Sequence, residues 1–234
     1  MAPVIEGAGV SLSYMMRGEG AAVLLVHGIG GSEWPPLPGR VVAYDRRGYG
    51  SSGAPEPYHR TTVEEQAEDA AALVSGLGLG PAVVVGDDLG GVIGLDLARR
   101  HRALVRGVVA IDPPLFAFVP EASEVLAAER AELERVLREE GPAEAVRAYF
   151  AERGREFAAR AAESHRAFFA DYGAAAGWSV GRRELRALDV PVWVLDGPRP
   201  LAHGRAASDA LAAVLPRCVR GGALREAVSS LLAA

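Results

Sequence analysis

Asp88 stands between glycines in a pattern that is typical of a reactive side chain. Residues 83–91 read Val-Val-Val-Gly-Asp-Asp-Leu-Gly-Gly, so a β-branched run ends at Gly86 and Asp88 lies midway between Gly86 and Gly90. Small neighbours let the backbone turn sharply and leave the central side chain accessible. A carboxylate is ionised near neutral pH, so Asp88 can attack an electrophilic carbon without a base, forming an ester that water must hydrolyse. The alternative role is structural, because Asp is also a good helix cap.

A second glycine-rich segment follows an earlier apolar run. Residues 21–26 read Ala-Ala-Val-Leu-Leu-Val, which predicts a strand buried on both faces, and residues 27–32 read His-Gly-Ile-Gly-Gly-Ser. Glycines let backbone N–H groups point into a site, where they stabilise developing negative charge on oxygen. His27 belongs to this segment, and we expect it to be structural, not catalytic, and to contribute to substrate binding.

Strands and helices alternate around these segments. The sequence predicts strands at residues 41–44, 83–86, 105–112 and 190–196, with helices at 61–77, 92–98 and 223–234. This order is typical of an α/β protein with a doubly wound, mostly parallel sheet, in which ligands bind outside the carboxyl ends of the strands. Asp88, the loop at His27 and Asp112 are therefore expected at one edge of the sheet. Asp87 is expected to point away from Asp88, as neighbours at a sharp turn do.

Residues 116–187 interrupt the alternation. They predict three helices, over 122–140, 142–154 and 156–172, and no strand. The predicted organisation is a core of residues 1–115 and 188–234 with residues 116–187 inserted as a helical cap.

Together these motifs resemble the α/β-hydrolase fold superfamily. The resemblance also includes the turn at residues 45–52, Asp-Arg-Arg-Gly-Tyr-Gly-Ser-Ser, to whose charges we assign no chemical role. With Asp in the elbow, the chain resembles the epoxide hydrolases and the haloalkane and fluoroacetate dehalogenases. The resemblance implies that Asp88 is the nucleophile, that the N–H groups of Ile29 and Leu89 form the oxyanion hole, and that the cap, or lid, follows the sixth strand.

The resemblance further implies a substrate site under the cap. Epoxide hydrolases hold the epoxide oxygen with cap tyrosines, which makes Tyr149 and Tyr172 the candidates, and Trp178 is a third candidate for substrate binding. Aromatic side chains at these positions also serve simply to pack a cap onto its core.

The partners of Asp88 depart from the family pattern. Relatives carry a catalytic His after the last strand, but residues 221–224 read Gly-Gly-Ala-Leu and no His follows His203. Asp112 stands at the family's alternative position for the acid, and His203 lies on the same rim, so both are predicted as catalytic. Asp112 paired with Asp88 would instead share a proton and perform acid–base chemistry without an ester. Leu89 replaces the Trp or Arg of the dehalogenases, and Gly30 stands where epoxide hydrolases favour a proline, so neither reaction is assigned.

We interpret the chain as an enzyme that acts on a small apolar organic metabolite. The predicted reaction is hydrolysis of an ester, lactone or epoxide-type C–O bond, or a non-covalent lyase, cyclase or isomerase step. The alternative is a catalytically impaired protein that binds an apolar ligand under its cap, or one that uses the cap surface to bind a partner.

Composition limits the partners. The 234 residues carry a formal charge of -5 with Lys and Arg scattered among acids, so no nucleic-acid partner is expected. No signal peptide or membrane span is recognisable, which predicts a cytoplasmic protein without a membrane partner. The single Cys218 permits no internal disulfide and no thiolate cluster, and we expect neither a cofactor nor a metal. A homodimer through the cap is the assembly we consider.

Overall fold

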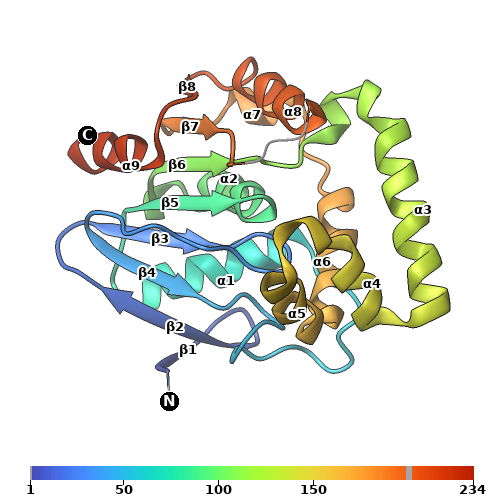
Figure 1. Cartoon of the computed structure of the whole chain (residues 1–234). Helices are drawn as coiled ribbons and strands as arrows, with labels where there is room; N and C mark the ends of the chain where they lie inside the picture. Colours follow the sequence, from blue (N-terminus) through green and yellow to red (C-terminus); the bar gives the residue numbers. More distant parts are fainter. Residues whose placement is uncertain (1, 199–201) are drawn as a thin grey trace.

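A computed structural model describes residues 2–198 and 202–234 and shows an eight-stranded sheet in the order β1-β2-β4-β3-β5-β6-β7-β8 (Figure 1). The first two strands pair antiparallel, β2 is antiparallel to β4, and the other strands are parallel. The predicted α/β fold with a mostly parallel sheet is confirmed. The strands are β1 (Val4–Glu6), β2 (Ser11–Arg17), β3 (Ala22–Val26), β4 (Arg40–Tyr44), β5 (Ala82–Asp87), β6 (Val105–Ile111), β7 (Val192–Leu195) and β8 (Cys218–Arg220).

Helices cover both faces of this sheet because its central strands are apolar on both sides. Alternate residues of β3 and β5 join two separate cores, Leu24 and Val84 in one, Val23 and Val83 in the other. The first core is closed by helices α1 (Val63–Gly76), α2 (Leu89–Arg100) and α8 (Ala202–Ala212), and the second by α9 (Leu224–Ala233). A short 3-10 turn, η1 (Arg102–Leu104), leads from α2 into β6.

Only helical elements lie between β6 and β7. They are η2 (Phe116–Phe118), η3 (Pro120–Ala122), α3 (Ser123–Glu140), α4 (Pro142–Tyr149), η4 (Ala151–Arg153), α5 (Arg155–Glu163), α6 (His165–Gly177) and α7 (Arg182–Arg186). We call α3 to α6 the cap helices; they lie beyond the arrowheads of β3 and β5 in Figure 1, at the carboxyl ends of the strands. The exact division into core and cap stays a prediction.

The third helix predicted in this insertion, over 156–172, is two helices, which corrects the expectation. The helical path breaks at Ser164, where φ is -103° and ψ is 32°, and the Ser164 N–H donates to the Ala161 carbonyl oxygen at 3.1 Å. No Gly or Pro marks the break, and buried apolar residues continue on both sides, including Phe157 in α5 and Phe168 in α6. Packing against the core therefore sets this break, and helical periodicity alone does not reveal it.

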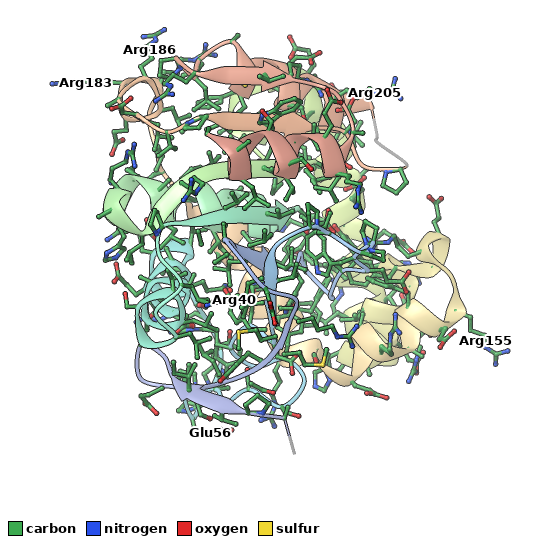
Figure 2. The ribbon with its side chains drawn as sticks, turned by 90° about the vertical axis from the view of Figure 1, so that its left-hand side faces the viewer. Arg40, Glu56, Arg155, Arg183, Arg186 and Arg205 are labelled. Carbon is green, nitrogen blue, oxygen red and sulfur yellow. The ribbon has the colours of Figure 1, made fainter. Side chains whose placement is uncertain are left out.

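The charged surface is spread over many elements. Figure 2 shows the side chains of Arg155, Arg183 and Arg205 projecting outward at separate points of the molecular outline. Within the part of the chain that the structure describes, no helix has the length and apolarity needed to cross a membrane.

Candidate active site

Asp88 occupies the sharp turn between β5 and α2 in a backbone conformation that L-residues rarely adopt. Its φ is 50° and its ψ is -122°. Its N–H donates to the Ile111 carbonyl oxygen at 2.8 Å, and its own carbonyl oxygen accepts from the Gly91 N–H at 2.9 Å. A conformation of this kind costs about 1–3 kcal/mol and persists only where the surroundings impose it. The side chain makes no helix-capping hydrogen bond, so the structural alternative for Asp88 lacks the contact on which it depends.

The glycines around Asp88 are required by close approach of backbone segments. A Cβ on Gly86 would lie 2.1 Å from the Gly90 carbonyl oxygen, and one on Gly90 would lie 2.0 Å from the Val26 carbonyl oxygen. In the neighbouring loop, a Cβ on Gly28 would lie 2.8 Å from the Asp88 Cβ. Helix α2 and the loop after β3 can therefore meet at Asp88 only because these positions lack side chains.

Of the two N–H groups predicted as oxyanion donors, that of Ile29 makes a hydrogen bond to Asp88. The Ile29 N–H donates to Asp88 Oδ2 at 3.0 Å, and the Leu89 N–H lowers the pKa of the same carboxyl. Fixed backbone donors at a buried site stabilise negative charge without the need to reorganise. The loop after β3 thus binds the Asp88 carboxylate, and the first turn of α2 favours its ionised form.

Asp88 is nevertheless not a fully ionised carboxylate at neutral pH. Burial, followed by the negative charge of Asp87, raises the pKa of Asp88 to about 7, while the N–H groups of Ile29 and Leu89 and the charge of Arg46 oppose the rise. Both protonation states are therefore populated near pH 7, and the ionised fraction is the form that can act as a nucleophile or a general base.

A cavity of about 470 Å³ opens beside the elbow, at the carboxyl ends of β5, β6 and β7. Asp87 lines it, and Asp87 Oδ2 accepts a hydrogen bond from Ser32 Oγ at 2.6 Å. Burial raises the pKa of the Asp87 carboxyl, an effect that Ser32 and Arg153 reduce. Asp87 does lie away from the Asp88 donors, but it faces this cavity, a role that the sequence reasoning missed. The sequence feature that indicates this placement is that Asp87 is the last residue of a buried strand.

Asp112 lines the same cavity from the next strand. It also has a left-handed backbone, with φ of 44°, and its N–H donates to the Leu195 carbonyl oxygen at 3.0 Å. Its Oδ1 atom is buried and has no hydrogen-bond partner among the described residues. Burial, with a contribution from Asp196, raises its pKa. The structure therefore brings Asp112 to the same cavity as Asp87, whereas Asp88, the next residue in the chain, is not among the residues that line it.

His203 does not line this cavity. It lies on α8, and its ring packs edge-on against Phe116 with 5.2 Å between the ring centroids. Among the described contacts of His203, none involves Asp88 or Asp112. The predicted pairing of His203 with Asp88 is thus not formed in this structure, because α8 directs the ring toward the apolar turn η2.

His27 is enclosed in the loop after β3. Its Nδ1 donates to the Gly28 carbonyl oxygen at 2.8 Å, and its Nε2 accepts from the Arg46 N–H at 3.1 Å. Burial, and after it the charge of Arg46, lowers the pKa of His27 to about 3. A neutral imidazole with both nitrogens engaged shapes the loop and has no free polar atom for a substrate.

The three aromatic candidates occupy different surroundings. Tyr149 lies at the end of α4 and is 40% exposed. Burial raises the pKa of its hydroxyl, and the nearby negative charge of Asp88 raises that pKa further. Tyr172 on α6 packs against Tyr149 with 6.1 Å between centroids. Trp178 is buried, and its indole N–H donates to Asp96 Oδ1 at 3.2 Å, so it attaches the end of α6 to α2 and is left out of the proposed substrate site.

Comparison with known proteins is consistent with this geometry. The family model described as the alpha/beta hydrolase fold matches residues 21–186. An uncharacterized hydrolase of Bacillus subtilis is 34% identical over 123 residues, which are 47% of this chain and 44% of that protein. Bifunctional epoxide hydrolase 2 of Sus scrofa is 34% identical over 129 residues, 51% of this chain and 23% of that protein. The match thus spans less than half the length of either relative.

Solved structures match over nearly the whole chain. A thermophilic esterase from Thermogutta terrifontis has 26% identity and a TM-score of 0.70, covering 94% of this chain and 89% of the esterase. An enol-lactonase from Burkholderia xenovorans has 23% identity and a TM-score of 0.74, covering 99% of this chain and 100% of the lactonase, and this likeness concerns the fold.

Proposed function

Because the chain belongs to the α/β-hydrolase fold family, we propose that it is a hydrolase whose nucleophile is Asp88 and whose substrate is a small apolar molecule with an epoxide-type, ester or lactone C–O bond. One observation carries the proposal: the Asp88 carboxylate, at a strained turn, accepts a hydrogen bond from the Ile29 N–H, and the Leu89 N–H also lowers its pKa. A buried acid with no capping bond in a costly conformation is typical of a functional site.

The covalent step follows from this arrangement. One oxygen of the ionised Asp88 carboxylate is held by the Ile29 N–H, and the other attacks an electrophilic carbon of the substrate. The C–O bond of an epoxide breaks, its electron pair stays on the ring oxygen, and that oxygen takes up a proton. Tyr149 is the proposed donor of this proton because it is the cap tyrosine near enough to Asp88 to interact with it electrostatically. The product of the step is an ester on Asp88.

Hydrolysis of that ester needs an activated water. Water adds to the ester carbonyl carbon, and the negative charge that develops on the carbonyl oxygen is stabilised by the same N–H groups of Ile29 and Leu89. No His follows His203 in the sequence. Asp112, with its unpartnered Oδ1 and raised pKa, is the proposed base. A missing or poor base costs about 10²–10⁴-fold in rate, so the ester is expected to clear slowly.

A second mechanism is favoured by the pKa of Asp88, about 7. At this value Asp88 can take a proton from water that attacks an ester or lactone directly, or from carbon in a lyase or isomerase step, without forming an ester. Asp87 and Asp112, whose pKa values burial raises, would serve as proton acceptors and donors in the adjoining cavity.

The first experiment measures the intact mass of the protein after incubation with a panel of small epoxides, esters and lactones. Wild type is compared with Asp88→Asn and Asp112→Asn. The covalent mechanism predicts an adduct on wild type, none on Asp88→Asn, and a longer-lived adduct on Asp112→Asn. Product without an adduct, abolished by Asp88→Asn, would favour the non-covalent mechanism. Binding without adduct or product would favour the catalytically impaired protein.

Isotope labelling shows whether the oxygen of the attacking water enters Asp88 or the product. In water enriched in oxygen-18, a single turnover through an Asp88 ester leaves the label in the peptide that contains Asp88, because water adds to the carbonyl carbon. Addition of free imidazole should hasten loss of the adduct, since the cavity borders Gly222 and Leu224, where this chain lacks the histidine of its relatives. Label found only in the product would exclude the ester.

A further inference from the structure

Asp171 on cap helix α6 is a fully buried carboxylate that binds three side chains of the core. Its Oδ2 accepts from Arg46 Nη2 at 2.6 Å and from the Tyr49 hydroxyl at 2.7 Å, and its Oδ1 accepts from Gln66 Nε2 at 2.8 Å. The side chain of Arg46 is 1% exposed and that of Asp171 is 0% exposed. Arg46 Nη1 also donates to Gln66 Oε1. We call these four residues the Asp171 cluster.

The Asp171 cluster holds the loop after β3 on both sides of Ile29. Arg46 Nη2 donates to the Gly28 carbonyl oxygen at 2.9 Å, and the Gly30 N–H donates to the Tyr49 hydroxyl at 3.4 Å. The two residues that flank Ile29 are thus each bound by a side chain that is itself bound to Asp171.

We propose that Asp171 is a positioning residue: through Arg46 and Tyr49 it fixes Gly28 and Gly30, and it thereby directs the Ile29 N–H toward Asp88. Fixing is needed because Gly28, Gly30 and Gly31 have no side chains to restrict the loop, and Gly30 has a left-handed backbone with φ of 79°. A residue of the cap helices thereby helps to orient a backbone N–H group of the core, the proposed oxyanion donor. The catalytic consequence rests on the proposed function, whereas the positioning itself does not.

A second buried ion pair provides a control that distinguishes positioning of the loop from a general loss of stability. Arg47, the next residue after Arg46, donates to Asp69 through Nε at 2.7 Å and through Nη2 at 3.0 Å, and both side chains are nearly unexposed. The described contacts of this pair reach Ala8, Glu65 and Tyr58 and not the loop after β3. Asp69→Asn therefore removes a comparable buried charge without touching Ile29.

The tyrosines offer a milder matched pair. Tyr49→Phe removes the hydroxyl that joins Asp171 to the Gly30 N–H and changes no charge. Tyr58→Phe removes a buried hydroxyl of the same region that donates to the Arg47 carbonyl oxygen at 3.3 Å. If Asp171→Asn folds poorly, Tyr49→Phe and its control Tyr58→Phe still test the proposal.

The experiment measures hydrogen exchange of the Ile29 and Gly30 amides by NMR in variants whose melting shows a folded state. We expect exchange of these amides to be at least about tenfold faster in Tyr49→Phe and Asp171→Asn, a loss of protection that local opening produces. In Tyr58→Phe and Asp69→Asn it should equal that of wild type. The pKa of Asp88, followed by its carboxyl carbon signal, should rise in Tyr49→Phe, because a loosened Ile29 N–H stabilises the ionised form less.

Unchanged exchange at Ile29 in both folded cluster variants, or an equal change in the controls, would overturn the positioning role. Turnover supplies a separate readout, since loss of an oxyanion donor lowers kcat and leaves KM nearly unchanged. If Asp88→Asn retains full turnover, the proposed function fails, and the exchange data still decide whether Asp171 positions the loop.

Discussion

At the scale of single residues, the fold holds Asp88 in an unfavourable backbone conformation and in surroundings that disfavour its ionised form. Its backbone is left-handed, and burial together with Asp87 raises its pKa to about 7. Each unit of pKa shift corresponds to about 1.4 kcal/mol between the protonated and ionised forms. The folded protein therefore bears a free-energy cost at Asp88 that grows as the side chain ionises.

The pH dependence of stability tests this cost. Folding raises the pKa of Asp88, so between about pH 4 and pH 7 the folded state keeps a proton that the unfolded state has released. The free energy of unfolding therefore falls as the pH rises through this window. Asp88→Asn does not titrate and should melt higher than wild type at about pH 8, with a smaller difference at about pH 5. Thermal unfolding at both pH values measures this, with the exposed Asp189→Asn as control. A variant that melts lower than wild type at the higher pH would show that Asp88 is stabilising.

At the scale of elements, β3, β5 and α2 converge on one turn. The approach is so close that the Gly90 Cα faces the Val26 carbonyl oxygen of β3, and the Gly86 Cα faces Gly90. The Ile29 and Leu89 donors come from the loop and helix that this approach brings together. The spacing of glycines is thus what allows a helix N-terminus and a neighbouring loop to share one carboxylate.

Substitution of these glycines should be far more harmful than substitution elsewhere. Gly90→Ala places a Cβ 2.0 Å from a backbone oxygen, so β3 or α2 must shift, and we expect a loss of at least about 2 kcal/mol in the free energy of unfolding. Gly173→Ala in α6 meets nothing within 4 Å and should be neutral or stabilising by about 0.5–1 kcal/mol. Urea unfolding of both variants measures the contrast. Equal stabilities would contradict the close approach.

At the scale of the whole molecule, two buried polar contacts join the inserted helices to the sheet domain. One is the Asp171 cluster, and the other is the bond from Trp178 to Asp96. Asp96 is fully buried and also accepts from Arg99 and Arg100 on its own helix. The cap helices are therefore attached to the core by directional bonds from the middle of α6, at Asp171, and from the residue that ends it, Trp178.

Loss of the Trp178 contact should loosen the insertion before the core. Trp178→Phe removes the indole donor and leaves a smaller ring, which we expect to lower the free energy of unfolding by about 1–3 kcal/mol. Limited proteolysis should then cleave near the end of α6 while the sheet stays intact. Trp193→Phe, which removes an indole from β7 in the core, should lower stability without selective cleavage at α6. Cleavage that is the same in both variants would mean that Trp178 is not a specific attachment.

Much of the site could be predicted from the sequence because it is made by local backbone geometry. The glycines that frame Asp88 and those after His27 dictate a sharp turn and exposed N–H groups, and strand–helix alternation dictates that they meet at the carboxyl ends of a parallel sheet. The substrate candidates were less predictable. Trp178 and Tyr149 have similar aromatic character, but one binds Asp96 and the other lies near Asp88.

The sequence by itself determined the α/β fold and the sharp turn at Asp88, because hydrophobic alternation and glycine spacing are local patterns, and the oxyanion role of Ile29 and Leu89 stays a prediction. Only the tertiary structure decided that Asp87 and Asp112 face one cavity, that His203 turns toward Phe116, and that Asp171 binds Arg46 across 125 positions. The physical reason is that a carboxylate's partners and its pKa depend on burial and on charges from distant segments, which no local pattern encodes.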